Sequence, residues 1–258
     1  MKNKKVLVLV TAPIEPIKSH KKIFDHPEFD YVFVTHDKEN KDAISFNKGM
    51  RWADNRNFLA DKYKNSNYDY FMFLDYDVDF ESKTELSVAE QILSDIDKYK
   101  PAVLNFYDPA KSDYIKKPNN DVIPYLVTNN QLKMFHSSLI DWFFPMETKF
   151  GGMWDTCHLF NMLEYPLKEH VLMSYNVQIH GLYNAPESQP KNGMQDMQNL
   201  HKWFIDKNAN KHNFSFKTHI EFKNYCMYLN TNNKINMKIN DTVDFKNLID
   251  KKYFRDFD

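Results

Sequence analysis

The chain has 258 residues, a length that suits one sizeable domain or one domain with an appendage. Its formal net charge is −1, so there is no electrostatic reason to expect nucleic acid as the main ligand. Five glycines argue against a glycine-rich phosphate loop and against repeats built on glycine turns.

Two cysteines, Cys157 and Cys226, stand outside any CxxC pattern, which predicts reduced, buried thiols rather than a zinc site or a disulfide framework. The apolar run at residues 6–10 is followed at once by prolines and a glutamate, so it indicates a first buried strand rather than a signal peptide. No apolar run approaches the roughly 20 residues that cross a bilayer. We therefore expect a cytoplasmic protein, with at most peripheral association at the inner face of the membrane.

Strand-like and helix-like segments alternate along the chain. Apolar runs rich in β-branched and aromatic residues predict buried strands at residues 6–10, 31–34, 68–74, 102–106 and 171–179. Apolar residues at helical spacing predict helices at residues 45–65, 86–96, 154–164 and 194–204. The alternation predicts an α/β sheet with parallel crossovers.

Local patterns refine this arrangement. Ser82-Lys83-Thr84-Glu85 fits a capping box at the start of the second helix. Residues 122–127 and 131–135 are separated by a short polar break, so we expect them to pair as a hairpin and make the sheet mixed. Polar residues dominate from about residue 187. We therefore divide the chain into a catalytic domain, 1–186, and a C-terminal extension packing on it, 187–258.

Three aspartates at alternate positions, Asp75, Asp77 and Asp79, directly follow the apolar run at 68–74. If the strand continues through them, their carboxylates share one face and repel one another. A divalent cation relieves this repulsion, and hard oxygen ligands suit Mg²⁺ or Mn²⁺. Ligands of α/β sheets bind at the carboxyl ends of the strands, where this cluster falls. The alternative is a solvated acidic turn, because a bare DxD pattern is a weak signal.

The stretch 49–80 places the pair Arg56-Asn57 on a predicted helix and Asp75-Tyr76-Asp77 at the end of the next strand. In both features it resembles the core of GT-A-fold glycosyltransferases. The resemblance implies a GT-A-like, Rossmann-type mixed sheet flanked by helices, with a small C-terminal helical extension.

In the family that this stretch resembles, the helix helps to bind the nucleotide end of the donor, and the DxD pair holds a metal that bridges the diphosphate. The resemblance thus implies a nucleotide-diphosphate sugar as donor, in particular a UDP-sugar, with Arg56 and Lys48 as donor-binding residues. Asp75 and Asp77 would hold Mn²⁺ or Mg²⁺ against the donor. The acceptor would be a glycan or another hydroxyl compound, in the synthesis of a surface polysaccharide or glycan. For Arg56 and Lys48 an ordinary surface role is the alternative.

Gly151 and Gly152 precede a predicted helix that begins with Trp154 and Asp155. In inverting enzymes of the resembled family, an acidic residue at the start of a late helix acts as general base on the acceptor hydroxyl, and Asp155 has a similar position. Trp154 would stack on a sugar ring of the acceptor. Thr156 stands where the family commonly has a second acidic residue, and Asp155 as a helix N-cap is an equal alternative.

Histidines supply further candidates. Many enzymes of the resembled family provide a histidine late in the chain as a further metal ligand, and His180, after a strand-like run and before Gly181, has such a position. His136 follows another strand-like run and would face the acceptor. We expect His158, within a predicted helix, to be structural.

These residues together predict a metal-dependent glycosyltransferase. A metal-dependent nucleotidyltransferase or phosphoesterase ranks second, because such enzymes also place carboxylate pairs at strand ends. Residues 11–13 offer no glycine-rich or basic grip for a triphosphate. A nucleotide-sugar-binding module without turnover, in which the acidic cluster only binds a cation, is the alternative from another class.

Overall fold

The computed structural model describes residues 5–110, 121–126, 131–148, 153–181, 193–208, 216–232, 234–238 and 245. Within these residues, nine strands form one sheet in the order β3-β2-β1-β4-β8-β6-β9-β5, with β7 paired to β9. The strands are β1 (Val6–Ala12), β2 (Phe29–Thr35), β3 (Ser45–Phe46), β4 (Tyr70–Asp75), β5 (Val78–Ser82), β6 (Val103–Tyr107), β7 (Val122–Pro124), β8 (Leu132–His136) and β9 (Val171–Gly181). The helices are α1 (Ser19–Ile23), α2 (Trp52–Tyr63), α3 (Val88–Tyr99), α4 (Ile140–Phe143), α5 (Met153–Glu164), α6 (Gly193–Asn208) and α7 (His219–Thr231), with 3₁₀ turns η1 (Ser137–Leu139) and η2 (Tyr165–Leu167).

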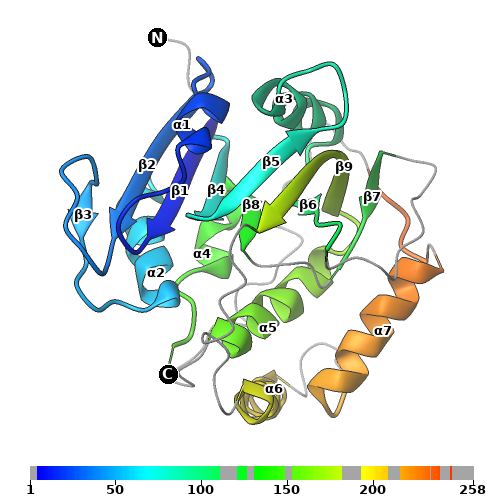
Figure 1. Cartoon of the computed structure of the whole chain (residues 1–258). Coiled ribbons are helices and arrows are strands. Elements are labelled where there is room, and N and C mark those ends of the chain that lie inside the picture. The colour runs from blue at the N-terminus through cyan, green and yellow to red at the C-terminus, as the bar shows by residue number, and fades with distance from the viewer. Residues whose placement is uncertain are drawn as a thin grey trace.

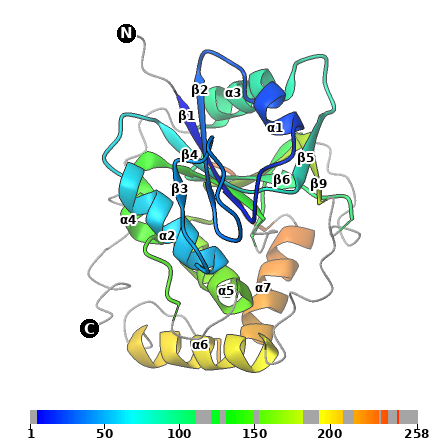
Figure 2. The same cartoon turned by 60° about the vertical axis from the view of Figure 1, so that its left-hand side comes forward.

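The sheet is mixed. β1 pairs in parallel with β2 and β4, β2 pairs in parallel with β3, and β6 pairs in parallel with β9. β8 runs antiparallel between β4 and β6, and β5 runs antiparallel to β9. Helices α1 and α3 cover one face, α2, α4 and α5 cover the other, and α6 and α7 lie outside α5 (Figures 1 and 2). The predicted class, an α/β mixed sheet flanked by helices, is confirmed.

The predicted hairpin is wrong. β7 pairs with β9, whereas β8 inserts between β4 and β6, so the two strands do not pair with each other. The polar break between them, residues 128–130, which suggested a tight turn, lies outside the described part of the chain. Both partners of β8 are strands distant in the sequence, and local patterning carries no signal for such pairing.

Two predicted helix starts also need correction. The chain is extended through Ser82, the last residue of β5, and the capping box forms instead at Ser87 and Glu90. Ser87 Oγ accepts from the Glu90 N–H at 3.3 Å, and the Glu90 carboxylate accepts from the Ser87 N–H at 2.9 Å. The first predicted helix begins at Trp52, because residues 45–46 form the edge strand β3.

Alternate residues of β1 supply two separate cores. Val6, Val8 and Val10 belong to the core under α1 and α3, and Leu7 and Leu9 belong to the core on the opposite face. All of them are at most 1% exposed. This continuous apolar strand is what a sheet covered on both faces requires.

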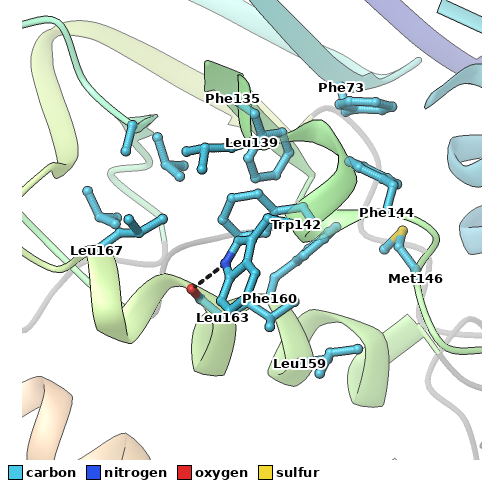
Figure 3. Close-up of a cluster of buried hydrophobic side chains, with 14 of the residues drawn as sticks. Phe73, Phe135, Leu139, Trp142, Phe144, Met146, Leu159, Phe160, Leu163 and Leu167 are labelled. Atoms are coloured by element: carbon cyan, nitrogen blue, oxygen red, sulfur yellow. Dashed lines mark hydrogen bonds between the residues drawn. The ribbon is translucent and has the colours of Figure 1, made fainter. Parts of the chain in front are cut away.

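The second core includes a group of aromatic side chains between the sheet, α4 and α5 (Figure 3). Phe73 and Phe135 of the sheet contact Phe144, and Phe135 also contacts Phe160 of α5. The indole N–H of Trp142 donates to the Leu163 carbonyl at 3.0 Å, so this buried ring leaves no polar atom unpaired. The core thereby fixes α5 against the strand that ends in Asp75.

The C-terminal helices contribute to this same core. Leu200 and Phe204 of α6, and Phe222 and Cys226 of α7, are each at most 1% exposed within it. Cys226 is a free buried thiol, as predicted, and burial raises its pKa to about 12. The side chain of Cys157 lies outside the described residues. Among the described helices, none combines the length and the apolar character needed to cross a membrane.

Candidate active site

The candidate site lies at the edge of the sheet where β1, β2 and β4 end. The chain leaves β1 toward β2 and returns on the other side of β1 as β4, which makes a topological switch point between β1 and β4. Thr11 near the end of β1 is in register with Asp75, the last residue of β4. Open α/β sheets bind ligands in the crevice at such a point.

Two side chains of α2 hold the Asp75 carboxylate. Asp75 Oδ1 accepts from Trp52 Nε1 at 2.6 Å and from Arg56 Nη2 at 2.9 Å. The two donors are one helical turn apart, and the Arg56 guanidinium lies 3.8 Å from the centre of the Trp52 ring. Trp52 was not predicted from the sequence as a residue of the site. Its four-residue spacing from Arg56 was the available signal.

Arg56 lies beneath the site rather than at its surface. The residue is 1% exposed, and its Nη2 also donates to the carbonyl of Gln131 at 3.1 Å. The same carbonyl accepts from the backbone N–H of Asp75 at 2.9 Å. Through Nη2, the guanidinium fixes Asp75 relative to Gln131, the residue before β8, and binding of the nucleotide by Arg56 stays a prediction.

Asp77 lies in a turn between β4 and β5, and both Asp75 and Asp77 are buried, at 9% and 6% exposure. The strand therefore does not continue through the three aspartates as predicted. Asp79 belongs to β5, where its Oδ1 accepts from Ser19 Oγ of α1 at 3.0 Å. Only Asp75 and Asp77 remain as candidate ligands at the end of β4.

Asn57, the residue after Arg56, binds a different segment. Its amide donates to the carbonyl of Met146 at 3.0 Å and accepts from the Met146 N–H at 2.5 Å. This reciprocal pair holds the segment that leads from α4 toward α5. The adjacent residues Arg56 and Asn57 thus link the acidic turn to the segment between α4 and α5. This role of Asn57 was not predicted from the sequence.

Buried hydroxyls line the ends of the neighbouring strands. The Oγ1 atoms of Thr11 and Thr35 are buried and have no hydrogen-bond partner among the described residues. A buried polar group without a partner costs free energy, so such atoms commonly face a ligand or water. Lys48 lies at the same edge: it is exposed, and the next residue, Gly49, donates its N–H to the carbonyl of His36 at 3.0 Å. Gly49 has a φ of 71°, which explains a glycine at this position.

A cavity of about 230 Å³ lies beside this edge, between α1 and β2. It is lined by Glu15, Pro16, Ile17, Lys18, Lys21, Tyr31, Phe33, Asn40 and Asp42.

The two candidate histidines lie at different parts of the sheet. His136 is in register with Tyr70 at the start of β4, the opposite end of that strand from Asp75, and its place at the acceptor stays a prediction. His180 pairs with Asp79 across β5 and β9, and its Nε2 lies 3.4 Å from Oε2 of Glu81.

Trp154 and Asp155 fall in the first turn of α5, which begins at Met153. Asp155 is therefore the third residue of the helix and not its N-cap, the alternative considered from the sequence. The side chains of Trp154 and Asp155 lie outside the described residues, as do Gly151 and Gly152.

The acidic turn has the donor set for a metal shared with a ligand. Among the described residues, no group of three or more His, Cys, Asp or Glu side chains could hold a metal ion by itself, so His180 is not grouped with Asp75 and Asp77. Mg²⁺ in nucleotide enzymes is typically bound by one or two carboxylates together with substrate phosphates and water. Two buried carboxylates fit this arrangement and do not fit a metal site formed by protein alone.

No family model and no curated protein sequence matches the chain. Its structure is similar to that of S. aureus TarS 1–349, with 13% sequence identity and a TM-score of 0.47, over 89% of this chain and 82% of that one. For the complex of the same protein with UDP, the identity is 12% and the TM-score 0.48, over 80% of this chain and 73% of that one. For the A197 protein from STIV, the identity is 12% and the TM-score 0.46, over 72% of this chain and 92% of that one. Similarity at this level assigns no activity to the chain.

Proposed function

We propose that the protein is a metal-dependent glycosyltransferase that uses a nucleotide-diphosphate sugar, with UDP as the nucleotide. The observation that carries the proposal is the buried pair Asp75 and Asp77 at the switch point of the sheet, with Asp75 held by Trp52 and Arg56. Two buried carboxylates separated by one residue in the sequence favour binding of a cation. A cation bound by only two carboxylates has coordination positions left for the oxygens of a diphosphate.

The surroundings of the pair support a nucleotide ligand. The unpartnered hydroxyl of Thr11, which is in register with Asp75, lies at this edge and would accept or donate a hydrogen bond to its ribose or base. Lys48 is exposed at this edge and would attract the negative charge of the diphosphate. Arg56 supports the pair through Nη2, which donates to Asp75 and to the carbonyl of Gln131.

The chemistry divides between the two halves of the site. Mn²⁺ or Mg²⁺ held by Asp75 and Asp77 would stabilise the negative charge of the nucleoside diphosphate leaving group. On the acceptor side, Asp155 in the first turn of α5 would take the proton of the attacking hydroxyl, and Trp154 would stack on a sugar ring of a glycan acceptor. A base in this role makes the reaction inverting at the anomeric carbon.

Calorimetry with UDP tests the binding step. We expect UDP to bind in Mn²⁺ and to lose its affinity in EDTA. Equal affinity in both buffers would remove the metal from the proposal.

Incubation with UDP-sugars and Mn²⁺ then tests turnover. A glycosyltransferase slowly releases UDP by hydrolysis and releases it faster with an acceptor glycan. Release of UMP and sugar phosphate would instead identify a phosphoesterase, and binding without any release would identify a non-catalytic module.

A further inference from the structure

The segment that begins α1 contacts the acidic turn and the start of β5 at three points. The N–H of Ile17 donates to the carbonyl of Tyr76 at 3.0 Å. Nε2 of His20 lies 2.6 Å from the carbonyl of Val78, and Ser19 Oγ donates to Asp79 Oδ1 at 3.0 Å. These contacts fall on both sides of Asp77.

The strands that flank Asp77 have different neighbours in the sheet. β4 pairs with β1 and β8, whereas β5 pairs with β9, which lies several strands away. Sheet hydrogen bonds therefore do not join the two ends of the turn. The segment 17–20 follows directly from β1, the parallel neighbour of β4, and it reaches across to the first residue of β5 (Figure 1).

His20 is chemically suited to this contact. It is 0% exposed, between the rings of Phe24, Tyr31 and Phe80. Because a carbonyl only accepts, Nε2 carries the proton that is donated to Val78, and Nδ1 is left facing the Tyr31 hydroxyl at 3.5 Å. Burial lowers the pKa of His20, so the ring stays neutral in this tautomer.

We propose that His20 is a positioning residue of the active site: it fixes Val78 to α1 and thereby sets where Asp77 stands relative to Asp75. It acts through the backbone and touches no ligand. The expected effect of His20 on the affinity for a metal-bound diphosphate rests on the proposed function. Its geometric content, the immobilisation of residues 76–79, stands without that function.

The positioning role of His20 can be tested with two substitutions, one that keeps an N–H for the Val78 carbonyl and one that removes it. His20→Gln keeps an N–H that can reach the Val78 carbonyl, and His20→Phe keeps a buried ring without a donor. Asn230→Leu is the matched control, because Asn230 makes equally buried bonds to the backbone of Leu126, on the opposite face of the sheet from α1. Ser19→Ala, which removes only the Asp79 bond, is the milder variant for use if His20→Phe does not fold.

Hydrogen exchange of the unliganded protein gives the first readout. We expect the peptide covering residues 76–79 to exchange about tenfold faster in His20→Phe, and to keep nearly its wild-type rate in His20→Gln and Asn230→Leu. If Ser19→Ala is used because His20→Phe does not fold, the exchange rate of the same peptide should rise, but by a smaller factor. Unchanged exchange in this peptide would overturn the positioning role, whatever the protein binds.

Calorimetry with UDP and Mn²⁺ gives the second readout. We expect Kd to rise about tenfold in His20→Phe, to recover in His20→Gln, and to stay at the wild-type value in Asn230→Leu although its melting temperature falls. An equal rise in the asparagine control would show that lost stability alone explains the effect, and would overturn the proposal. Wild-type protein that does not bind UDP at all would instead refute the proposed function, while the exchange result still decides the role of His20.

Discussion

Arg56 and Asp75 form an ion pair at 2.9 Å in which the arginine side chain is 1% exposed and the aspartate side chain 12% exposed. Such a pair contributes little net stability when intact, but removing one partner leaves the other charge in a medium that solvates it poorly. The two candidate metal ligands therefore differ: Asp75 is tied to the fold through Arg56, whereas Asp77 stands in the turn that follows.

Asparagine substitutions should separate these two aspartates. Asp75→Asn is expected to lower the free energy of unfolding by about 3 kcal/mol, because the buried Arg56 loses its counter-charge. Asp77→Asn should abolish transfer, because it removes a ligand charge, and should hold or slightly raise the free energy of unfolding, because it relieves the repulsion between the two carboxylates. Urea denaturation measures both. A severe loss of stability in Asp77→Asn would show that this residue is structural.

Trp52→Phe should weaken the binding of UDP without disturbing the ion pair between Arg56 and Asp75. Phenylalanine keeps a ring beside the Arg56 guanidinium and removes only the indole N–H that donates to Asp75 at 2.6 Å. We expect the Kd for UDP in Mn²⁺ to rise about tenfold, as for a lost hydrogen bond to a charged group. Trp203→Phe on α6 is the control and should leave the affinity unchanged. Equal affinities in the two variants would mean that the Trp52 contact has no part in binding.

Asp155→Asn tests the proposed general base. Asparagine cannot accept the proton of the acceptor, so turnover should fall by roughly 10²–10⁴-fold while donor affinity and melting temperature stay near their wild-type values. Full turnover in the asparagine variant would remove Asp155 from the mechanism and favour a retaining enzyme.

Acid should destabilise the junction of α5, α6 and α7 through three buried histidines. His158 Nε2 lies 3.0 Å from His201 Nδ1, and His201 Nε2 donates to the Phe216 carbonyl at 3.0 Å. Burial, with a further contribution from His201 and His219, lowers the pKa of His158 to about 3, and burial also lowers those of His201 and His219.

The direction of the pH effect on stability is set by the unfolded chain, in which histidine has a pKa of about 6.5. Above that pH, His158 is neutral in both states, and it does not make the free energy of unfolding depend on pH. Below that pH, His158 binds a proton in the unfolded state and remains neutral in the folded state. The free energy of unfolding therefore falls by about 1.4 kcal/mol per pH unit for this residue until its folded pKa is reached. His158→Gln keeps an N–H donor and should flatten the loss between pH 6 and 4 in urea denaturation. The same slope in variant and wild type would show that His158 is not responsible.

The strands β1, β2 and β4 could be predicted because each contains a continuous apolar run, the pattern of a strand covered on both faces. The start of α3 could not, because Ser82 and Ser87 are each followed three residues later by glutamate. Both match a capping box, and only the pairing of β5 with β9 shows that Ser82 is still in a strand.

At the site, the residue types of the DxD pattern indicated Asp75 and Asp77 correctly as residues at the end of a buried strand. The direction of Arg56 could not be inferred, because a helical arginine before an acidic turn can face a ligand or the protein interior. Burial decides between these, and burial depends on the insertion of β8, whose Gln131 carbonyl accepts from Arg56. Long-range strand pairing of this kind leaves no trace in local periodicity.

The contribution of α6 and α7 to the core beneath the sheet has a consequence for synthesis on the ribosome. Phe160 and its neighbours on α5 share a core with Phe204, Phe222 and Leu229, which are translated later. A nascent chain that ends before α7 would present this aromatic surface to water, and each such side chain forgoes about 1.5–3 kcal/mol of burial. The polypeptide should therefore acquire its native tertiary structure only after residue 229 has left the exit tunnel, and shorter nascent chains should be the ones that chaperones bind.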